Sequence, residues 1–229
     1  MKLLIKYPSR GRFELMLENV KRICDLITDE NTIILLSLDL DDKTIDYNRL
    51  SSLKKYSKKV KVFLGKSETK INAYNRDLVN IDFDYMLPIS DYTEIYAKGF
   101  DSIIIKQISI YREFVDLVNG KADIGLFFKS INSCNSNKNH LSVHHLLYLI
   151  PKTFYDKRKY IYSPALKNNF HNEILKKQLQ AFTKNVYPCT VPIHKYVHPL
   201  WFYSEVDKYS IQAQKTWKDD LKILEHYGI

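Results

Sequence analysis

The chain has 229 residues, three widely spaced cysteines and a formal net charge of +9 at pH 7. This length can bury one substantial core, and the lack of a Gly/Ser-rich linker predicts a single domain over residues 1–229. The cysteines lack metal-type spacing, so we expect free thiols, which fits a reducing cytosol. No apolar run could cross a bilayer and no signal peptide is evident, so we expect a cytoplasmic location, in the host cytoplasm if the Lys/Asn/Tyr-rich, Gly-poor composition reflects a viral origin.

Short apolar runs that stop at polar or turn-forming residues predict strands in the first part of the chain. They cover residues 3–7, 32–38, 60–64 and 85–89. Helical patterns follow the first and third runs, at 13–26 and 71–78. This alternation is typical of an α/β fold with a mostly parallel central sheet and flanking helices. The polar ends of the strands would then gather along one rim of the sheet.

The second part of the chain continues the alternation. Apolar residues at spacings of three and four predict a long amphipathic helix between Ile104 and Val118, which Gly120 would end. The remaining expected elements are strands at 124–128 and 146–150, a helix at 174–182, and a final helix packed against the sheet through Trp217, Leu221 and Leu224.

The most informative residue is Asp91, because the apolar run 85–89 delivers it where a buried strand should end. In open α/β sheets the ligand lies beyond the carboxyl ends of the strands, so an Asp there faces ligand or metal. The alternative interpretation is a helix cap or a turn, where Asp is also favoured. The other predicted strands also end in polar residues, which favours a binding site at Asp91 over a helix cap or a turn.

The positive charge favours an anionic partner, whether a nucleoside diphosphate, nucleic acid or a membrane surface. Lysines crowd residues 54–61, 157–159 and 176–177. Neither an aromatic-interleaved strand nor a recognisable nucleic-acid module accompanies them, so a solvated surface explains each cluster equally simply.

Ordered motifs along most of the chain carry a family resemblance. They are residues 6–12, residues 65–67 leading into 70–77, residues 86–91, and a late His198-Pro199. Together they resemble GT-A type glycosyltransferases of the family-2-like group, particularly the short versions from bacteriophages, large viruses and bacteria. The resemblance implies a Rossmann-like GT-A domain. In that domain, residues 1–95 would bind a nucleoside diphosphate sugar, with UDP-sugar favoured, and residues 96–229 would form the acceptor side and a C-terminal cover.

The resemblance also implies roles for individual residues. It assigns Asp91 to the short acidic motif that holds Mn²⁺ or Mg²⁺ against the diphosphate and thereby contributes to catalysis. A hard divalent cation prefers oxygen ligands and would neutralise the charge of the leaving diphosphate. For Arg10, Arg12 and Arg76, which would contact phosphate, the alternative is surface solvation or an ordinary ion pair. The residues assigned to the nucleotide and donor sugar are Pro8, Ser9, Arg10, Arg12, Asp39 or Asp41, Lys70, Asn72, Arg76 and Ser90.

The sequence departs from the family pattern beside Asp91. Many relatives have a second acidic residue there, whereas this chain has Tyr92, with Glu94 near enough in sequence to compensate. By resemblance, His198 would complete the metal site from a C-terminal loop, although a structural role is the alternative. His194 has no counterpart, and Pro192 opposes a helix there, so we expect His194 on a loop surface.

A candidate catalytic base follows a tyrosine-rich segment. Residues 160–164 and the later Asn172-Glu173 match in outline a Tyr-x-Tyr-x-Pro stretch that precedes an acidic pair in similar proteins. An inverting transferase needs a carboxylate to take the acceptor proton, and Glu173 is the candidate. The alternative is a Glu favoured at a helix N-terminus by the helix dipole.

The sequence leaves the acceptor open. If the chain is viral, a hydroxymethylated base in DNA is attractive, and the basic surface would hold the phosphate backbone. A glycan, a lipid-linked sugar or a protein would serve equally. A non-catalytic nucleic-acid-binding protein would explain the charge but not the polar strand ends. A nucleotidyltransferase normally needs a Gly-rich triphosphate loop, which the single Gly11 does not provide.

Overall fold

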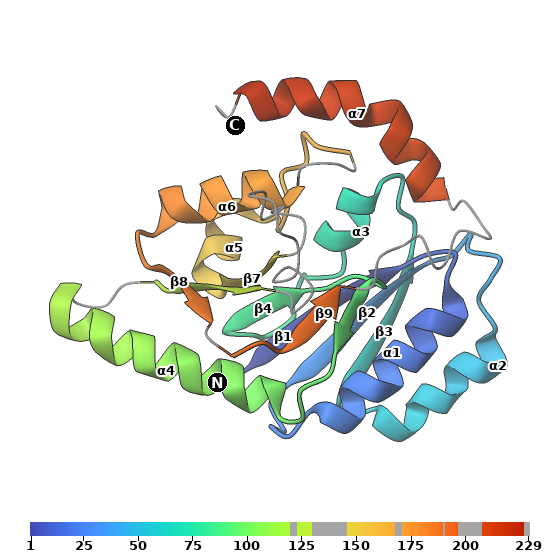
Figure 1. Cartoon of the computed structure of the whole chain (residues 1–229). Coiled ribbons are helices and arrows are strands. Elements are labelled where there is room, and N and C mark those ends of the chain that lie inside the picture. Colours follow the sequence, from blue (N-terminus) through green and yellow to red (C-terminus); the bar gives the residue numbers. More distant parts are fainter. Residues whose placement is uncertain (120–122, 130–145, 168–170, 190, 197–207, 227–229) are drawn as a thin grey trace, which may run out of the picture.

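The computed structural model describes residues 1–119, 123–129, 146–167, 171–189, 191–196 and 208–226. These residues form a seven-stranded sheet in the order β3-β2-β1-β4-β7-β6-β8, flanked by helices (Figure 1). Its strands are β1 (Leu3–Ser9), β2 (Ile33–Asp39), β3 (Val60–Gly65), β4 (Tyr85–Pro88), β6 (Gly125–Lys129), β7 (Leu146–Pro151) and β8 (Val186–Cys189). The strands from β1 to β4 are mutually parallel, β7 is antiparallel to β4 and β6, and β8 is parallel to β6.

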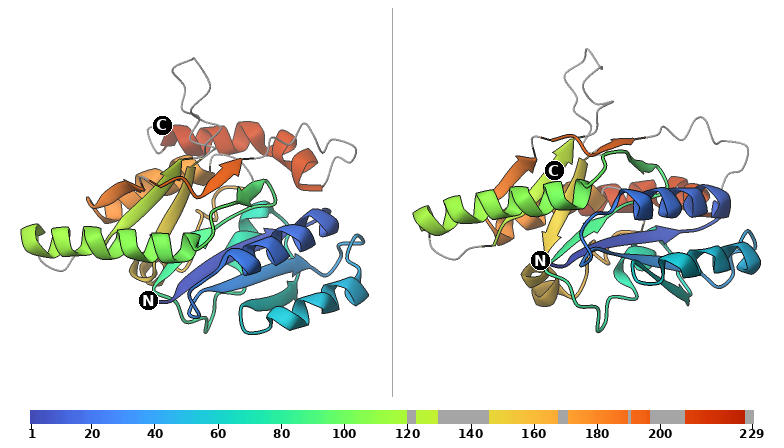
Figure 2. Two further views of the ribbon diagram at one scale, coloured as in Figure 1. Left: turned by 60° about the horizontal axis from the view of Figure 1, so that its bottom comes forward. Right: turned by 90° about the horizontal axis from the view of Figure 1, so that it is seen from below.

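One face of the sheet is covered by α1 (Phe13–Leu26), α2 (Tyr47–Leu50), the 3-10 helix η1 (Ser51–Tyr56) and α4 (Phe100–Asn119). Both α1 and α4 lie over this face, and the start of α4 lies near the end of α1, where the N–H group of Gly99 donates to the carbonyl oxygen of Leu26 at 2.8 Å (Figure 2). Helix α1 buries Phe13, Met16, Leu17 and Val20 at helical spacing, and they pack against Leu3, Ile5 and Tyr7 of β1 in one core cluster.

The opposite face is covered by α3 (Lys70–Asn75), α5 (Lys152–Arg158) and α6 (His171–Phe182). Alternate residues of the strands, such as Leu4 and Leu35, join Ile71 and Leu175 in a second core cluster. Burial on both faces explains why the central strands are continuous apolar runs and do not alternate with polar residues. The predicted α/β class, with a mostly parallel sheet and flanking helices, is therefore confirmed.

A small second sheet lies beyond the end of β4. Strand β5 (Thr93–Ile95) pairs antiparallel with β9 (His194–Tyr196), with Thr93 opposite Tyr196 and Ile95 opposite His194. The prediction of a surface loop at His194 is wrong: its side chain is 1% exposed. A proline two residues away prevents a helix but does not prevent a short strand.

Two expectations for helices are corrected. Helix α3 ends at Asn75 and does not continue to Leu78, because Arg76 is extended and Asp77 adopts a positive φ of 66°. Helix α7 (Lys208–His226) lies outside α3 and α6, away from the sheet (Figure 1). Its Leu224 is buried, but Trp217 is 46% exposed, so the helix does not pack on the sheet through Trp217.

None of the helices in the described ranges combines the length and apolar character that a membrane span requires.

Candidate functional site

Polar residues meet at the carboxyl edge of the parallel strands. The register places Ser9 beside Leu38 and Asp39 beside Gly65, so the ends of β1, β2 and β3 are level. Strand β4 pairs directly with β1, and three residues after its Pro88 the chain reaches Asp91. The predicted gathering of strand ends at one rim is confirmed, because parallel strands share one carboxyl edge.

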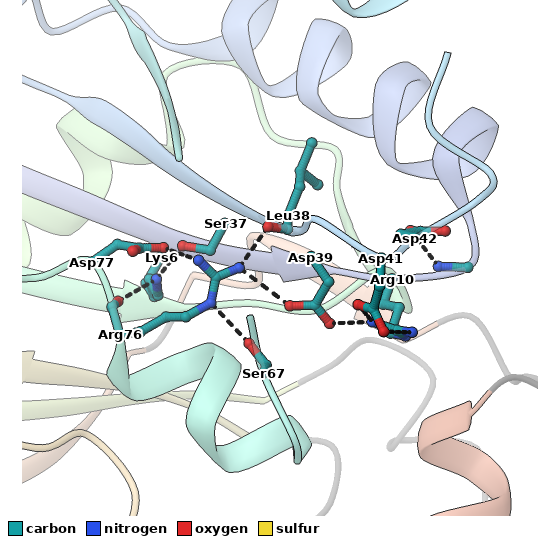
Figure 3. Close-up of polar contacts among 11 residues, drawn as sticks. Lys6, Arg10, Ser37, Leu38, Asp39, Asp41, Asp42, Ser67, Arg76 and Asp77 are labelled. Carbon is teal, nitrogen blue, oxygen red and sulfur yellow. Dashed lines mark hydrogen bonds and ion pairs between the residues drawn. The ribbon is translucent and has the colours of Figure 1, made fainter. Parts of the chain in front are cut away.

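Asp39 is the centre of an ionic network at this rim (Figure 3). Its side chain is 1% exposed and accepts hydrogen bonds from Arg10 Nη1 at 2.9 Å and Arg76 Nη2 at 3.3 Å. Arg10 also donates to both carboxylate oxygens of the exposed Asp41. The hydrogen bond to Asp41 raises the pKa of Arg10, against the opposing effect of burial. The two aspartates therefore orient guanidinium groups at the rim.

Arg76 is held from several sides. It donates to Ser67 Oγ at 2.8 Å, to the carbonyl oxygen of Leu38 at 2.7 Å and to Asp77 Oδ2 at 2.6 Å. A Cβ atom at position 65 would collide with the guanidinium, so Gly65 leaves the space that Arg76 occupies. A side chain with this many partners keeps one orientation in the absence of a ligand.

We expect Asp39→Asn to lower the free energy of unfolding by about 2 kcal/mol, because it leaves two partly buried guanidinium groups without their shared counter-charge. Asp41→Asn is the matched control, since its side chain is 59% exposed, and it should cost less than about 1 kcal/mol. Urea denaturation of the two variants and the wild type measures both values. Equal losses in the two variants would contradict a central role for Asp39.

Lys6 lies beneath this network with no exposed surface. Its ammonium group donates to Ser37 Oγ and, at 2.8 Å, to the carbonyl oxygen of Arg76. Burial lowers the pKa of Lys6 to about 7, with Asp77 opposing and Arg76 adding to the shift. A lysine inside a central strand therefore supports the turn that carries Arg76.

The lowered pKa of Lys6 makes stability depend on pH. Between about pH 7 and the ordinary lysine pKa of 10.5, the unfolded chain binds the proton and the folded protein does not. Stability must then rise with pH across this window. We expect the free energy of unfolding to rise by roughly 1 kcal/mol per pH unit more in the wild type than in Lys6→Met. Urea denaturation at about pH 7.5 and 9.5 tests this, and parallel curves would refute it.

Asp91 is 7% exposed and pairs with Arg12, whose Nη1 lies 3.4 Å from Asp91 Oδ2. Its Oδ1 is buried and has no hydrogen-bond partner among the described residues. Burial raises the pKa of Asp91, although Arg12, Ser9 and Tyr7 act in the opposite direction. Asn19 Nδ2 donates to the Asp91 carbonyl oxygen at 3.1 Å and to Tyr7 Oη at 3.2 Å. Helix α1 thus fixes the backbone of Asp91.

Two cations accompany Asp91. The guanidinium of Arg12 lies 4.6 Å from the ring centroid of Tyr92, so Tyr92 supplies a cation–π contact. Burial and then Arg12 lower the pKa of Lys70 to about 8, whereas Asp91 raises it. Lys70 is the first residue of α3. Because Arg12 and Asp91 both act on its pKa, the three side chains share one electrostatic environment.

The buried Oδ1 atom of Asp91 fits a divalent ion, because a carboxylate oxygen withdrawn from water needs a cation or a donor. Glu94, the possible second carboxylate, pairs with Arg22 at 2.9 Å. Within the described ranges, no three His, Cys, Asp or Glu side chains form a metal-binding group. His198, the other expected ligand, lies outside the described residues.

A second cluster surrounds the start of α6. Tyr162 Oη lies 3.3 Å from Asn172 Oδ1, and its ring meets those of Tyr74 and His171 at centroid distances of 4.9 and 4.7 Å. Burial raises the pKa of Tyr162, and the charge of Glu173 adds to this shift. Tyr74 Oη donates to the carbonyl oxygen of Ile89 at 2.9 Å, which connects this cluster to the segment that leads to Asp91.

The expected site residues therefore fall into three groups. Arg10, Asp39, Asp41 and Arg76 form the first network, and Arg12, Lys70 and Asp91 the second. Glu173 lies in the aromatic cluster. The other residues expected to contact the sugar donor lie on the same rim or on α3. Pro8 and Ser9 are buried at the end of β1, Asn72 is exposed on α3, and Ser90 is half-buried in the turn that closes on Thr93.

Sequence reasoning missed several residues that support the site. Asn19 lies on a predicted helix, and Lys6 and Tyr7 lie in a predicted strand, although both of them belong to the motif at residues 6–12. Asn75 could have been found, because it belongs to the motif at residues 70–77. Its side chain accepts hydrogen bonds from the backbone N–H groups of Ile161 and Tyr162 and donates to the Tyr162 carbonyl oxygen at 2.7 Å. Asn75 therefore joins the first helix after β3 to the Glu173 cluster.

Comparison with known proteins supports the fold. No protein-family model matches the sequence, and no curated protein matches it significantly. Among solved structures, S. aureus TarS 1–349 in complex with UDP-GlcNAc has a TM-score of 0.63 at 12% identity, over 92% of this chain and 61% of that chain. GalNAc-T7 with UDP, GalNAc and Mn²⁺ has a TM-score of 0.60 at 12% identity, over 96% and 49%.

A third similar structure is the mannosyltransferase PcManGT from Pyrobaculum calidifontis in complex with GDP-Man and Mn²⁺. Its TM-score is 0.56 at 7% identity, over 84% of this chain and 56% of that chain. All three are GT-A glycosyltransferases, and this chain has the GT-A, Rossmann-like fold that they share. The chain spans 43% of another structure of S. aureus TarS.

Proposed function

We propose that the protein is a glycosyltransferase that moves a sugar from a nucleoside diphosphate sugar, with UDP-sugar favoured, to a hydroxyl acceptor. The observation that carries this proposal is the buried Asp91 carboxylate beside Arg12 and Lys70 at the carboxyl edge of the sheet. A carboxylate and two cations at that edge suit a diphosphate and its counter-ion. The donor complexes of the similar structures support the same ligand class.

We assign the donor to the segment of the chain before residue 96. Ser9, Arg10 and Asp39 at the ends of β1 and β2 would contact the base and ribose, with Pro8 and Asp41 beside them. Arg12, Lys70 and Arg76 would contact the phosphates, with Asn72 and Ser90 near the sugar. Guanidinium groups that carboxylates already orient lose little side-chain entropy when a phosphate binds. The segment from residue 96 onward would supply the acceptor side and a cover.

Asp91 would hold Mn²⁺ or Mg²⁺, and His198 is the second proposed ligand. The end of β9 supports Asp91 and His198 as ligands of one ion. Tyr196 lies opposite Thr93, which is two residues after Asp91, and His198 is two residues after Tyr196. Two residues reach at most about 7 Å. Such an ion would neutralise charge on the leaving diphosphate. Asp91 and its neighbouring cations orient that diphosphate.

Glu173 would take the proton of the acceptor hydroxyl. Its place at the start of α6 supports this role. Tyr74 connects that end of α6, through His171, to the end of β4, and Asn75 connects the segment before α6 to α3. A base must stand across the donor sugar from the diphosphate if the attack displaces it directly. The inversion of configuration that this implies is part of the proposal.

The test is incubation of the protein with Mn²⁺ and a panel of UDP- and GDP-sugars, with measurement of nucleoside diphosphate release. A single preferred donor is expected, together with an increase in melting temperature when that nucleotide binds. Acceptor panels of glycans and of DNA with and without hydroxymethylated bases identify the hydroxyl. If nucleic acid binds but no nucleotide sugar is bound or consumed, the protein is a binding module and the proposal fails.

A further inference from the structure

The hydroxyl group of Tyr148 is a buried polar group for which the fold offers no use. Tyr148 lies in β7, is 2% exposed, and its Oη makes no hydrogen bond with any residue in the described ranges. Most buried hydroxyl groups have a partner, and one without a partner lowers stability. A phenylalanine would fill the same space without that cost. The hydroxyl therefore calls for a functional explanation.

The surroundings of this hydroxyl indicate what it faces. Tyr148 belongs to the core cluster on the α6 side of the sheet, together with Tyr74 and Tyr162. After burial, the negative charge of Glu173 is the second cause that raises the pKa of Tyr148. The pKa of Tyr162 is raised by burial, by Tyr148 and by Glu173. Tyr148 therefore shares a core cluster with Tyr162 on the side of the sheet where α6 packs against β7, and the charge of Glu173, at the start of α6, acts on both hydroxyl groups.

The three groups differ in how they are engaged. Tyr162 Oη lies 3.3 Å from Asn172 Oδ1, so its hydroxyl already has a polar partner. Tyr148 keeps its proton at physiological pH, because burial and the neighbouring charge both raise its pKa and favour the neutral phenol. Its O–H is thus an available donor next to an acceptor-only carboxylate.

We propose that Tyr148 is a positioning residue for Glu173, and that its hydroxyl donates a hydrogen bond to the Glu173 carboxylate when the acceptor is bound. This rests on the proposed role of Glu173 as the base. In the reaction, the acceptor oxygen forms a bond to the anomeric carbon, and the bond from that carbon to the diphosphate oxygen breaks. The acceptor proton passes to Glu173, and Tyr148 retains its own proton throughout.

The proposal gives Tyr148→Phe a combination of effects that a structural role would not produce. The variant should melt at the same temperature as the wild type or a few degrees higher, because an unpaired buried hydroxyl is removed. Its kcat should fall about tenfold, the loss that corresponds to one charge-assisted hydrogen bond. The acidic limb of its kcat profile should move about one unit to higher pH, because the lost hydrogen bond favoured the ionised carboxylate.

Tyr85→Phe is the matched control. Tyr85 is also buried in the sheet, but its hydroxyl accepts a hydrogen bond from Arg112 at 3.2 Å and lies in the other core cluster. This variant should melt at a lower temperature and keep the wild-type kcat and pH profile. The contrast separates loss of a paired hydroxyl from loss of an unpaired one.

Melting curves and steady-state pH profiles of the three proteins decide the question. A lower melting temperature for Tyr148→Phe, comparable to that of Tyr85→Phe, would show that the hydroxyl serves the fold and would overturn the inference even without an assay of activity. Unchanged kcat and pH profile in Tyr148→Phe, with an active wild type, would also overturn it. Failure of the wild type to consume any nucleotide sugar would instead refute the proposed function.

Discussion

Replacing Asp91 by Asn is expected to lower nucleoside diphosphate release by a factor of about a hundred or more, which corresponds to roughly 3 kcal/mol of transition-state stabilisation. Asn has the shape of Asp but neither its charge nor its affinity for a divalent ion. Arg12 would keep its contact with Tyr92 but would lose its carboxylate partner. The loss should appear in kcat/KM and in the Mn²⁺ concentration needed for half-maximal activity.

The fold of this variant should be retained. The hydrogen bond that fixes the Asp91 backbone comes from Asn19 and does not involve the carboxylate. Asp156→Asn is the control, because Asp156 lies on α5, which follows β7 and so begins at the opposite edge of the sheet, and it pairs there with Lys152. It should behave as wild type. Unchanged turnover in Asp91→Asn would remove Asp91 from the mechanism.

Replacing Glu173 by Gln is expected to lower kcat for sugar transfer by a factor of about a hundred to ten thousand, the usual contribution of a general base. Gln retains the shape and hydrogen-bonding capacity of Glu but cannot accept the acceptor proton. Donor affinity should stay within about twofold of wild type, because Glu173 belongs to the aromatic cluster and is assigned no contact with the donor. Calorimetric titration with the nucleoside diphosphate and single-turnover transfer assays measure the two quantities separately.

Glu18→Gln is the matched control for the base. Glu18 is exposed on α1, on the opposite face of the sheet from α6, and the change should leave both quantities at wild-type values. A loss of donor affinity in Glu173→Gln equal to its loss of kcat would instead place Glu173 in the donor site. Asp91→Asn and Glu173→Gln report on different parts of the reaction. Asp91→Asn should weaken donor binding in the presence of Mn²⁺, and Glu173→Gln should not.

Some features of the candidate site are accessible from the sequence because they are local. An apolar run that stops at a polar residue marks the end of a buried strand wherever it occurs, and this pattern alone locates Ser9, Asp39 and Asp91. The order of the runs and helices is enough to place these ends on one rim, because parallel strands connected by helices must share their carboxyl edge.

Other features depend on partners that are distant in the sequence. Lys6 lies in a predicted strand, but its partners, Ser37 and the carbonyl oxygen of Arg76, come from distant segments of the chain. Arg10 and Asp39 were both expected to contact the nucleotide, and their contact with each other is visible only when β1 and β2 are paired. The prediction for His194 was wrong because its burial depends on pairing with Ile95.

The sequence by itself determined the α/β class, the strand ends that form the rim and the position of Asp91, because hydrophobic periodicity and strand length are properties of a few consecutive residues. Only the tertiary structure decided which charges neutralise one another, where the tyrosines gather around Glu173, and that the Tyr148 hydroxyl lies buried without a partner among the described residues. Ion pairs and burial depend on which segments the fold brings within a few ångströms, and no local pattern encodes that distance.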